Sequence, residues 1–494
     1  MHLAKAGIKT YLVEREPTIG GKMALLDKVF PALDCSQCIL APKMVESNNN
    51  ENVEVMAYSE VVGVEGSVGD FKVKVRRRPR YVTDACVACG KCSEKCPTKV
   101  SNQLERGMSD RKAIYMPFPQ AIPNKYLIDE EKCLYLTKGV CRLCEKKCET
   151  KAIDFEQMEE IVELEVGAII LATGFKIFDA EKKTEYGYHR YPNVIINLDF
   201  ERLINACGPT EGRLKRPSDG QTPKKVAFIQ CVGSRDENFA KYCSTVCCNI
   251  TLKHCALIKE KYPETDVYVY YIDMRTHGKG NEEFYQDVRK KGVNFIRGRP
   301  GEILENEDKS LKLVAEDADT GILFQNDVDL VVLAAGFYPA DGLEELNKIL
   351  HVQSDSTGFL MEGHPNLRPT ETNTDGIYIC GCAQSPKPIN DSVAQAGSAV
   401  ASALDVLERD VIEVEGNVAE IDQEKCIKCR ICEHVCPFNA ISYNEQEDRL
   451  EVDEVMCKGC GLCNAACFSS AIQQRHFKDR QLIEQVKGFL EVQA

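Results

Sequence analysis

The sequence has no run of about 18 apolar residues, the length that a helix needs to cross a bilayer, so we predict no membrane span. Its first residues also lack the charged start and apolar stretch of a secretory signal. It contains no tryptophan, and its 62 basic residues are outnumbered by 76 acidic ones, which disfavours nucleic-acid binding. We therefore expect a cytoplasmic protein whose net charge of −14 suits docking to basic partners.

Cysteine, by contrast, is abundant. The 494 residues include 26 cysteines, too many and too closely spaced for a disulfide scaffold, because such scaffolds belong to small secreted domains. In a reducing compartment, tight cysteine spacing indicates metal ligands. The length predicts roughly three domains of ordinary size.

Two tight motifs stand near the carboxyl terminus: Cys426-x2-Cys429-x2-Cys432-x3-Cys436-Pro437 and Cys457-x2-Cys460-x2-Cys463-x3-Cys467. This pattern is typical of bacterial ferredoxins with two 4Fe–4S clusters, in which the fourth cysteine of each motif binds the other cluster. Zinc ribbons are the alternative, but they use cysteine pairs without a crossing fourth ligand. We assign one cluster to Cys426, Cys429, Cys432 and Cys467, and the other to Cys457, Cys460, Cys463 and Cys436.

The same pattern occurs earlier with one distortion. Cys86-x2-Cys89-x2-Cys92-x3-Cys96-Pro97 is followed by Cys133-x7-Cys141-x2-Cys144-x3-Cys148, in which the first gap is longer. A longer loop can still deliver a thiolate, so we assign one cluster to Cys86, Cys89, Cys92 and Cys148, and another to Cys133, Cys141, Cys144 and Cys96. Residues 97–132 are expected to form a solvated loop, with a docking surface as the alternative. Four clusters in one chain indicate a relay for single electrons.

Apolar strands ending in small residues surround these motifs. Residues 8–14 predict a buried strand ending in Glu14, and similar strands occur at 168–174, 331–336 and 376–383. Small residues at a strand end let the backbone approach a cofactor. Residues 225–235 begin a second nucleotide-binding lobe without the expected G-x-G-x-x-G loop. We expect that lobe to have kept its fold and lost nicotinamide binding.

The order of these strands resembles that of thioredoxin-reductase-like flavoproteins, which implies an α/β fold with two dinucleotide-binding lobes and bound FAD. On that resemblance Glu14 contacts the ribose, and the other FAD contacts are Gly20, Gly21, Ala172, Thr173, Gly174, Gly381, Cys382, Val393 and Ala394. That class normally has Asp at the position of Cys382. The first strand and its pyrophosphate-binding loop are also missing, so we expect either a fragment or another chain that supplies them.

The predicted domains alternate. The FAD-binding domain comprises residues 1–80, 156–221 and 346–415, and a ferredoxin domain is inserted at 81–155. A second Rossmann-like domain with a cysteine cluster covers 222–345, and a ferredoxin domain at 416–475 and a tail at 476–494 complete the chain.

The remaining cysteines are less specific. Cys231, Cys243, Cys247 and Cys248 occupy the position of the lost nucleotide loop, and their spacing permits either a fifth 4Fe–4S cluster or buried thiols at a helix start. Their place beside the expected flavin favours the cluster. For Cys35 and Cys38, a redox disulfide and half of a further cluster are equally supported, ahead of a buried pair. Cys207 and Cys255 are expected to be core thiols.

This arrangement resembles the A subunit of heterodisulfide reductase over nearly the whole chain, with close matches at residues 34–43, 112–121 and 231–248. The resemblance implies an oxidoreductase component whose FAD bifurcates the electron pair of a hydrogenase- or dehydrogenase-type donor between ferredoxin and a disulfide-reducing partner subunit. It also implies a homodimer within a larger complex. Lys253 would lie near the reactive flavin nitrogen and stabilise reduced, anionic flavin; otherwise it is an exposed helix lysine.

Two other functions fit the sequence. One is a non-bifurcating relay of flavin and clusters in a quinone-linked or acyl-thioester-reducing complex. The other is a binding scaffold that holds clusters but no flavin, because the first FAD loop is missing.

Overall fold

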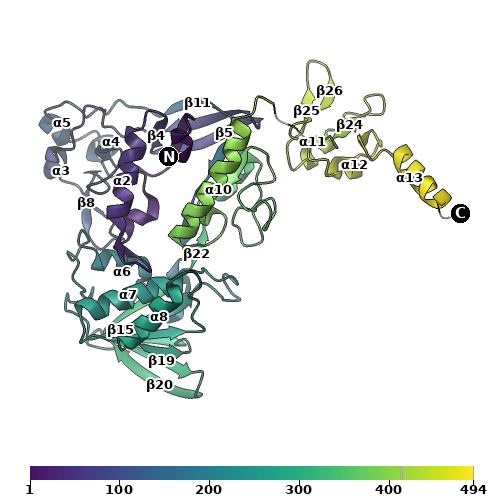
Figure 1. Ribbon diagram of the computed structural model, residues 1–494. Coiled ribbons are helices and arrows are strands. Elements are labelled where there is room, and N and C mark those ends of the chain that lie inside the picture. Colours follow the sequence, from purple (N-terminus) through teal and green to yellow (C-terminus); the bar gives the residue numbers. More distant parts are fainter. Residues whose placement is uncertain (412, 414–415, 493–494) are drawn as a thin grey trace.

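A parallel sheet in the order β14-β21-β15-β16-β17 forms the core of the lobe in the lower half of Figure 1. Its strands are apolar on both faces, because helices cover one face and an antiparallel sheet covers the other. The parallel strands are β14 (Val194–Ile196), β15 (Lys225–Val232), β16 (Asp266–Tyr271), β17 (Asn294–Arg297) and β21 (Leu330–Ala335). The helices are α6 (Asn197–Ile204), α7 (Cys247–Lys261) and α8 (Asn281–Lys290), and the antiparallel strands are β18 (Glu302–Glu305), β19 (Leu311–Asp317) and β20 (Ile322–Val328).

The structure is a computed structural model that describes residues 1–411, 413 and 416–492. Short sheets build the other lobe of the main body, called the first lobe below; the lobe around the parallel sheet is the second lobe. They pair β1 (Thr10–Glu14) with β4 (Val53–Ala57), β12 (Ile169–Leu171) with β23 (Ile377–Ile379), and β13 (Phe175–Ile177) with β22 (Phe337–Pro339). A three-stranded antiparallel sheet joins β5 (Ser59–Ser67), β6 (Asp70–Arg77) and β11 (Glu160–Val166), and the helices are α1 (His2–Lys5), α2 (Ser36–Asn49), α9 (Leu343–Leu350) and α10 (Ile389–Leu407).

Strand β1 differs from its expectation in burial. Its side chains are only half-buried, and Leu12 is 37% exposed. Within the described ranges, β4 is the one strand that pairs with β1, so β1 lies at the edge of a two-stranded sheet. The expectation of a buried strand at residues 8–14 is therefore wrong in this respect.

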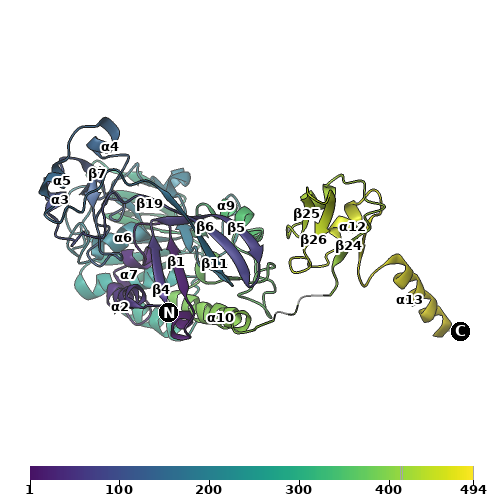
Figure 2. The same cartoon turned by 90° about the horizontal axis from the view of Figure 1, so that it is seen from above.

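The inserted ferredoxin module lies against the first lobe (Figure 2). Its helices are α3 (Lys91–Lys95), α4 (Leu134–Lys138) and α5 (Leu143–Lys147), and its strands are β7 (Lys99–Ser101), β8 (Asp110–Lys112), β9 (Ile114–Tyr115) and β10 (Leu127–Ile128). Residues 97–132 do not form the expected solvated loop. Phe118 and Ile122 are buried and pack with Ile19 and Met44 of the first lobe, because these apolar side chains gain from leaving water.

The carboxyl-terminal module lies to one side of the main body, and α13 (Asp479–Val492) projects further away (Figures 1 and 2). Its helices are α11 (Ile431–Val435) and α12 (Leu462–Ala466), and its strands are β24 (Ala419–Ile421), β25 (Ile441–Asn444), β26 (Arg449–Val452) and β27 (Ile472–Gln474). The ammonium of Lys458 pairs with the Asp375 carboxylate of the main body. Among the helices described here, none is long and apolar enough to cross a membrane.

Candidate functional site

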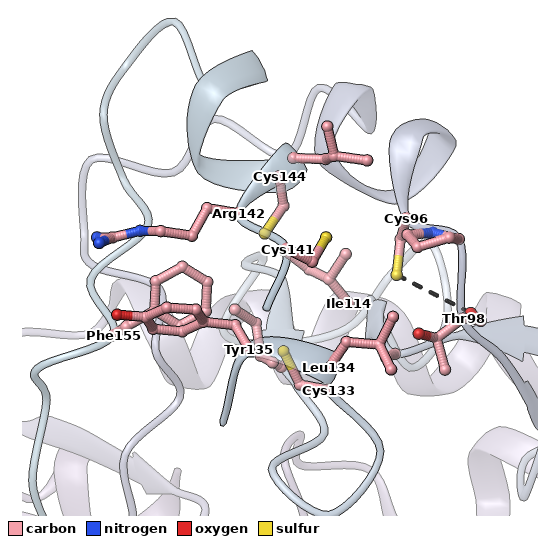
Figure 3. Close-up of a pocket in the computed structure, with 14 residues that line it drawn as sticks. Cys96, Thr98, Ile114, Cys133, Leu134, Tyr135, Cys141, Arg142, Cys144 and Phe155 are labelled. Carbon is pink, nitrogen blue, oxygen red and sulfur yellow. Dashed lines mark hydrogen bonds between the residues drawn. The ribbon is translucent and has the colours of Figure 1, made fainter. Parts of the chain in front are cut away.

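Four cysteines of the inserted module line one cavity, and their sulfur atoms point toward the same space (Figure 3). They are Cys96, Cys133, Cys141 and Cys144, the set that the crossing rule assigns to one cluster. The long gap after Cys133 is occupied by α4, which ends at Gly139 in a left-handed conformation and returns the chain to Cys141. Ile114, Ile128 and Phe155 contribute apolar walls.

The carboxyl-terminal module repeats this arrangement. Cys436, Cys457, Cys460 and Cys463 line a cavity of their own, again the set assigned to one cluster. Helices α11 and α12 pack together as α3 and α5 do in the inserted module. Both sets of thiols are therefore arranged around a small apolar space.

The last cysteine of each module accepts a backbone hydrogen bond. The Ala152 N–H donates to Cys148 Sγ over 3.2 Å, and the Ala471 N–H donates to Cys467 Sγ over 3.3 Å. These sulfurs belong to the two remaining sets, Cys86, Cys89, Cys92 and Cys148, and Cys426, Cys429, Cys432 and Cys467. Donors of this kind stabilise a thiolate that binds a metal.

Both modules fit a multi-iron cluster better than a single ion. Within the described ranges, no three His, Cys, Asp or Glu side chains converge closely enough to hold one metal ion. The thiols instead surround a space, as a cluster requires. Burial raises the pKa of Cys92 and of Cys463 to about 11, so these buried thiols would lose their protons only to a bound metal.

A further group of thiols lies at the carboxyl end of β15. Cys231 lies within an irregularity in the pairing of β15 with β21, Cys247 and Cys248 begin α7, and Cys243 lies in the intervening segment. Burial raises the pKa of Cys248 to about 12, and the neighbouring Cys231 and Cys243 act in the same direction. The structure thus brings together the four cysteines that were expected to hold a fifth cluster.

The acid at the end of β16 does not face an open nucleotide site. Arg235 pairs with both carboxylate oxygens of Asp273, and the Nε of Arg275 lies 3.3 Å from one of them. Arg235 also donates its backbone N–H to the Tyr242 carbonyl over 3.0 Å, in the segment that replaces the glycine loop. In a nicotinamide-binding lobe, this acid would bind a ribose.

The residues expected to contact FAD lie at exposed ends of strands and helices in the first lobe. Ala172 and Thr173 follow β12, and Val393 and Ala394 lie near the start of α10; all are exposed. An added Cβ at Gly174 would meet no other atom, so the backbone there is open to a ligand.

The other expected FAD contacts occupy two turns. Gly20 and Gly21 both have positive φ, and an added Cβ at Gly20 would lie 2.9 Å from the sulfur of Met44, so this position requires glycine. Gly381 donates its N–H to the Gln395 side chain over 2.8 Å. The Cys382 thiol lies 3.4 Å from the Lys387 carbonyl.

Glu14 ends β1, as expected for a ribose ligand. Burial raises the pKa of its carboxyl group, which accepts the Glu16 N–H over 2.8 Å. Together with the exposed strand ends and open glycine turns, this acid fits an extended dinucleotide cofactor.

Lys253 is not an exposed helix lysine. It lies on α7 with 2% of its surface exposed, pairs with the Glu201 carboxylate and donates to the Lys28 carbonyl over 2.8 Å. His254 Nε2 lies 2.6 Å from the same Glu201 oxygen. Although burial acts to raise it, these partners lower the pKa of Glu201 to about 2.

Sequence reasoning missed Glu201, His254 and Arg235. The sequence of α6 does not distinguish Glu201 from the neighbouring Asp199 and Arg202, and its partner Lys253 is 52 residues away. Burial lowers the pKa of His254, so we assign a neutral imidazole beside a charged pair of Glu201 and Lys253.

Six cysteines lie outside the cluster sets. Cys380 is buried, Cys382 is half-buried, and the other four differ in exposure. Cys35 and Cys38 are both exposed, which excludes the buried pair, and the Cys38 N–H donates to Cys35 Sγ over 3.3 Å. Cys255 is buried as expected. Cys207 is exposed, so its assignment to the core is wrong; it lies just beyond α6 in a surface turn.

Relatives of known name match most of the chain. It is 49% identical over 448 residues to the A subunit of the H(2):CoB-CoM heterodisulfide,ferredoxin reductase of Methanothermobacter thermautotrophicus, covering 90% of this chain and 67% of that protein. It is 50% identical over 454 residues to the second iron-sulfur A subunit of the CoB–CoM heterodisulfide reductase of Methanopyrus kandleri, covering 91% and 68%. The 4Fe-4S dicluster domain family matches residues 425–471. Among solved structures, T. acidophilum thioredoxin reductase aligns with 83% of this chain and 93% of its own length, at 13% identity and a TM-score of 0.46.

Proposed function

Because this chain belongs to the family of heterodisulfide reductase A subunits, we propose that it binds FAD and 4Fe–4S clusters and bifurcates electrons from a two-electron donor. One electron of each pair goes to ferredoxin and the other to a disulfide-reducing partner subunit. The names of the Methanothermobacter relative and of a Methanosarcina acetivorans relative both include ferredoxin and the CoB–CoM heterodisulfide.

The observation that carries this proposal is the thiol group of Cys231, Cys243, Cys247 and Cys248 at the carboxyl end of the parallel sheet. In doubly wound folds, ligands bind at this edge. The group stands where a nicotinamide would bind, and the nearby ribose acid, Asp273, is already paired with Arg235. A cluster at this position would exchange single electrons in place of a hydride.

Bound FAD would accept electrons in pairs and release them one at a time. The role of Lys253 is to place a cation near that cofactor. Its ammonium is fixed between Glu201 and the Lys28 carbonyl. Lys28 lies seven residues after Gly21, in the segment that follows the turn of Gly20 and Gly21, which we expect to contact FAD. The ferredoxin modules then supply routes for electrons toward partner proteins.

The first test is cofactor content. We expect the protein, purified without oxygen together with its natural partner subunits, to contain FAD and about twenty iron atoms per chain, corresponding to five clusters. Absence of FAD would support a cluster scaffold and contradict the proposal. If the protein contains FAD but only about sixteen iron atoms per chain, the assignment of a fifth cluster is wrong and the four clusters of the ferredoxin modules remain.

A further inference from the structure

The cysteine cavities of the two ferredoxin modules carry different side chains at one equivalent position. Gln474 lines the cavity of Cys436, Cys457, Cys460 and Cys463. Phe155 lines the matching cavity in the inserted module. Each stands seven residues after the last cysteine of its module, Cys467 or Cys148, so the two side chains occupy equivalent places.

Gln474 is buried without a partner for its amide. Only 6% of its surface is exposed, and neither Nε2 nor Oε1 makes a hydrogen bond within the described part of the chain. It lies on β27 opposite Ala419 of β24, whose backbone N–H donates to Cys457 Sγ over 3.4 Å. Buried amides almost always have partners, so this one indicates an acceptor inside the cavity.

Phe155 supplies no such donor. Its ring packs against Tyr135 with centroids 4.4 Å apart, so this cavity has an aromatic wall where the other has an amide. The fourfold thiol arrangement is otherwise shared by the two modules. The equivalent position in the inserted module therefore has no side-chain donor.

We propose that Gln474 donates a hydrogen bond from Nε2 to a sulfur atom of the cluster that Cys436, Cys457, Cys460 and Cys463 would hold. This inference rests on the proposed function, because it requires these cysteines to bind a cluster. Reduction adds negative charge to a cluster, and a donor stabilises that charge, so the hydrogen bond raises the reduction potential. The cluster in the carboxyl-terminal module then has a higher potential than it would have without the Gln474 amide.

Substitution of Gln474 tests this directly in the complete complex. Gln474→Leu and Gln474→Met both remove the amide at similar side-chain size. We expect each to lower the one-electron equilibrium constant for reduction of that cluster about tenfold, which is about 59 mV, in redox titrations followed by electron paramagnetic resonance. The reciprocal change Phe155→Gln should raise the potential of the matching cluster in the inserted module.

Gln473→Leu is the matched control. Gln473 precedes Gln474 on the same strand and points to the opposite face, where its amide donates to Asp479 over 3.4 Å. This variant should leave all cluster potentials unchanged. A measurement on the unsubstituted protein adds an independent readout. When the side-chain amide of glutamine is labelled with ¹⁵N, pulsed electron paramagnetic resonance should detect this nitrogen coupled to the reduced cluster.

The outcomes separate the hydrogen bond from the cluster itself. If the unsubstituted protein lacks the iron of this cluster, the ligand assignment in the proposed function fails. If the iron is present but neither Gln474 variant shifts a potential, the hydrogen bond is refuted. Absence of the ¹⁵N coupling in an iron-replete protein refutes it as well, even if the variants lose their clusters.

Discussion

Glu201 and Lys253 form an ion pair in the interior of the protein, where each side chain is 2% exposed. The other Glu201 oxygen accepts the Asp27 N–H over 3.0 Å, so one carboxylate connects α6, α7 and the segment that follows the turn at Gly20 and Gly21. A buried charge is stable only when it is paired. The position of the Lys253 ammonium is therefore determined by residues of three separate parts of the chain.

Removing the carboxylate should cost stability. We expect Glu201→Gln to destabilise the second lobe by about 3–5 kcal/mol, because Lys253 would remain buried without its counter-charge. Urea denaturation followed by circular dichroism measures the change. Glu237→Gln is the control, since its pair with Lys241 is exposed and such pairs contribute at most about 1 kcal/mol. Equal stability of the two variants would show that the buried pair is not a stabilising contact.

Removing the Lys253 ammonium should lower the reduction potential of the flavin. If Lys253 faces the cofactor, the double substitution Lys253→Met with Glu201→Gln removes both charges and leaves no unpaired charge. We expect FAD to remain bound while its two-electron equilibrium constant for reduction falls about tenfold, or about 30 mV, in a spectroscopic redox titration. Lys253→Arg keeps the charge and should shift the potential less. An unchanged potential in the double variant would place Lys253 away from the flavin.

His254 predicts a dependence of stability on pH. Burial lowers its pKa in the folded protein below the usual 6.5. As pH falls below 6.5, the unfolded chain binds a proton that the folded protein does not, so folding stability decreases by at most about 1.4 kcal/mol per pH unit. The unsubstituted protein should lose this stability as the pH falls from 7 to 5, whereas His254→Gln should not, so the stability advantage of the unsubstituted protein over the variant should narrow. A constant difference would contradict the neutral imidazole.

Cys133 has the least regular spacing of the ferredoxin cysteines, yet it lines the cavity with Cys96, Cys141 and Cys144. We expect Cys133→Ala to lose the iron of one cluster, about four atoms per chain, in an anaerobic iron assay. Cys255→Ala is the control, because Cys255 is a buried thiol of the apolar core that lines neither cysteine cavity. Full iron content in the Cys133 variant would exclude it as a ligand.

The sequence assigns the ferredoxin cysteines to sets by local spacing, and in the structure two of these sets line cavities, while their role as ligands stays a prediction. The resemblance to heterodisulfide reductase A subunits is confirmed by relatives over about 90% of the chain. It also predicted an apolar strand at 331–336 and the start of a nucleotide-binding lobe at 225–235, where the structure has β21 and β15. These features can be recognised without knowing which distant segments meet.

Features that depend on distant contacts were missed. The partners of Lys253 are Glu201 on α6 and the Lys28 carbonyl, and no spacing rule connects them. Residues 97–132 look like a loop because their strands are short, and only the packing on the first lobe shows that Phe118 and Ile122 of this segment are buried. The contrast between Gln474 and Phe155 emerges only when the two cavities are compared.

The central claim is that the flavin couples two electron transfers, and its most direct test is the dependence of ferredoxin reduction on the disulfide acceptor. The complete complex is given its two-electron donor and ferredoxin, and the reduction of ferredoxin is followed by absorbance with and without the heterodisulfide. We expect ferredoxin reduction only when the heterodisulfide is present, with one electron delivered to each acceptor for every pair consumed. Reduction of ferredoxin at the same rate without the disulfide would contradict bifurcation and identify the chain as a simple relay.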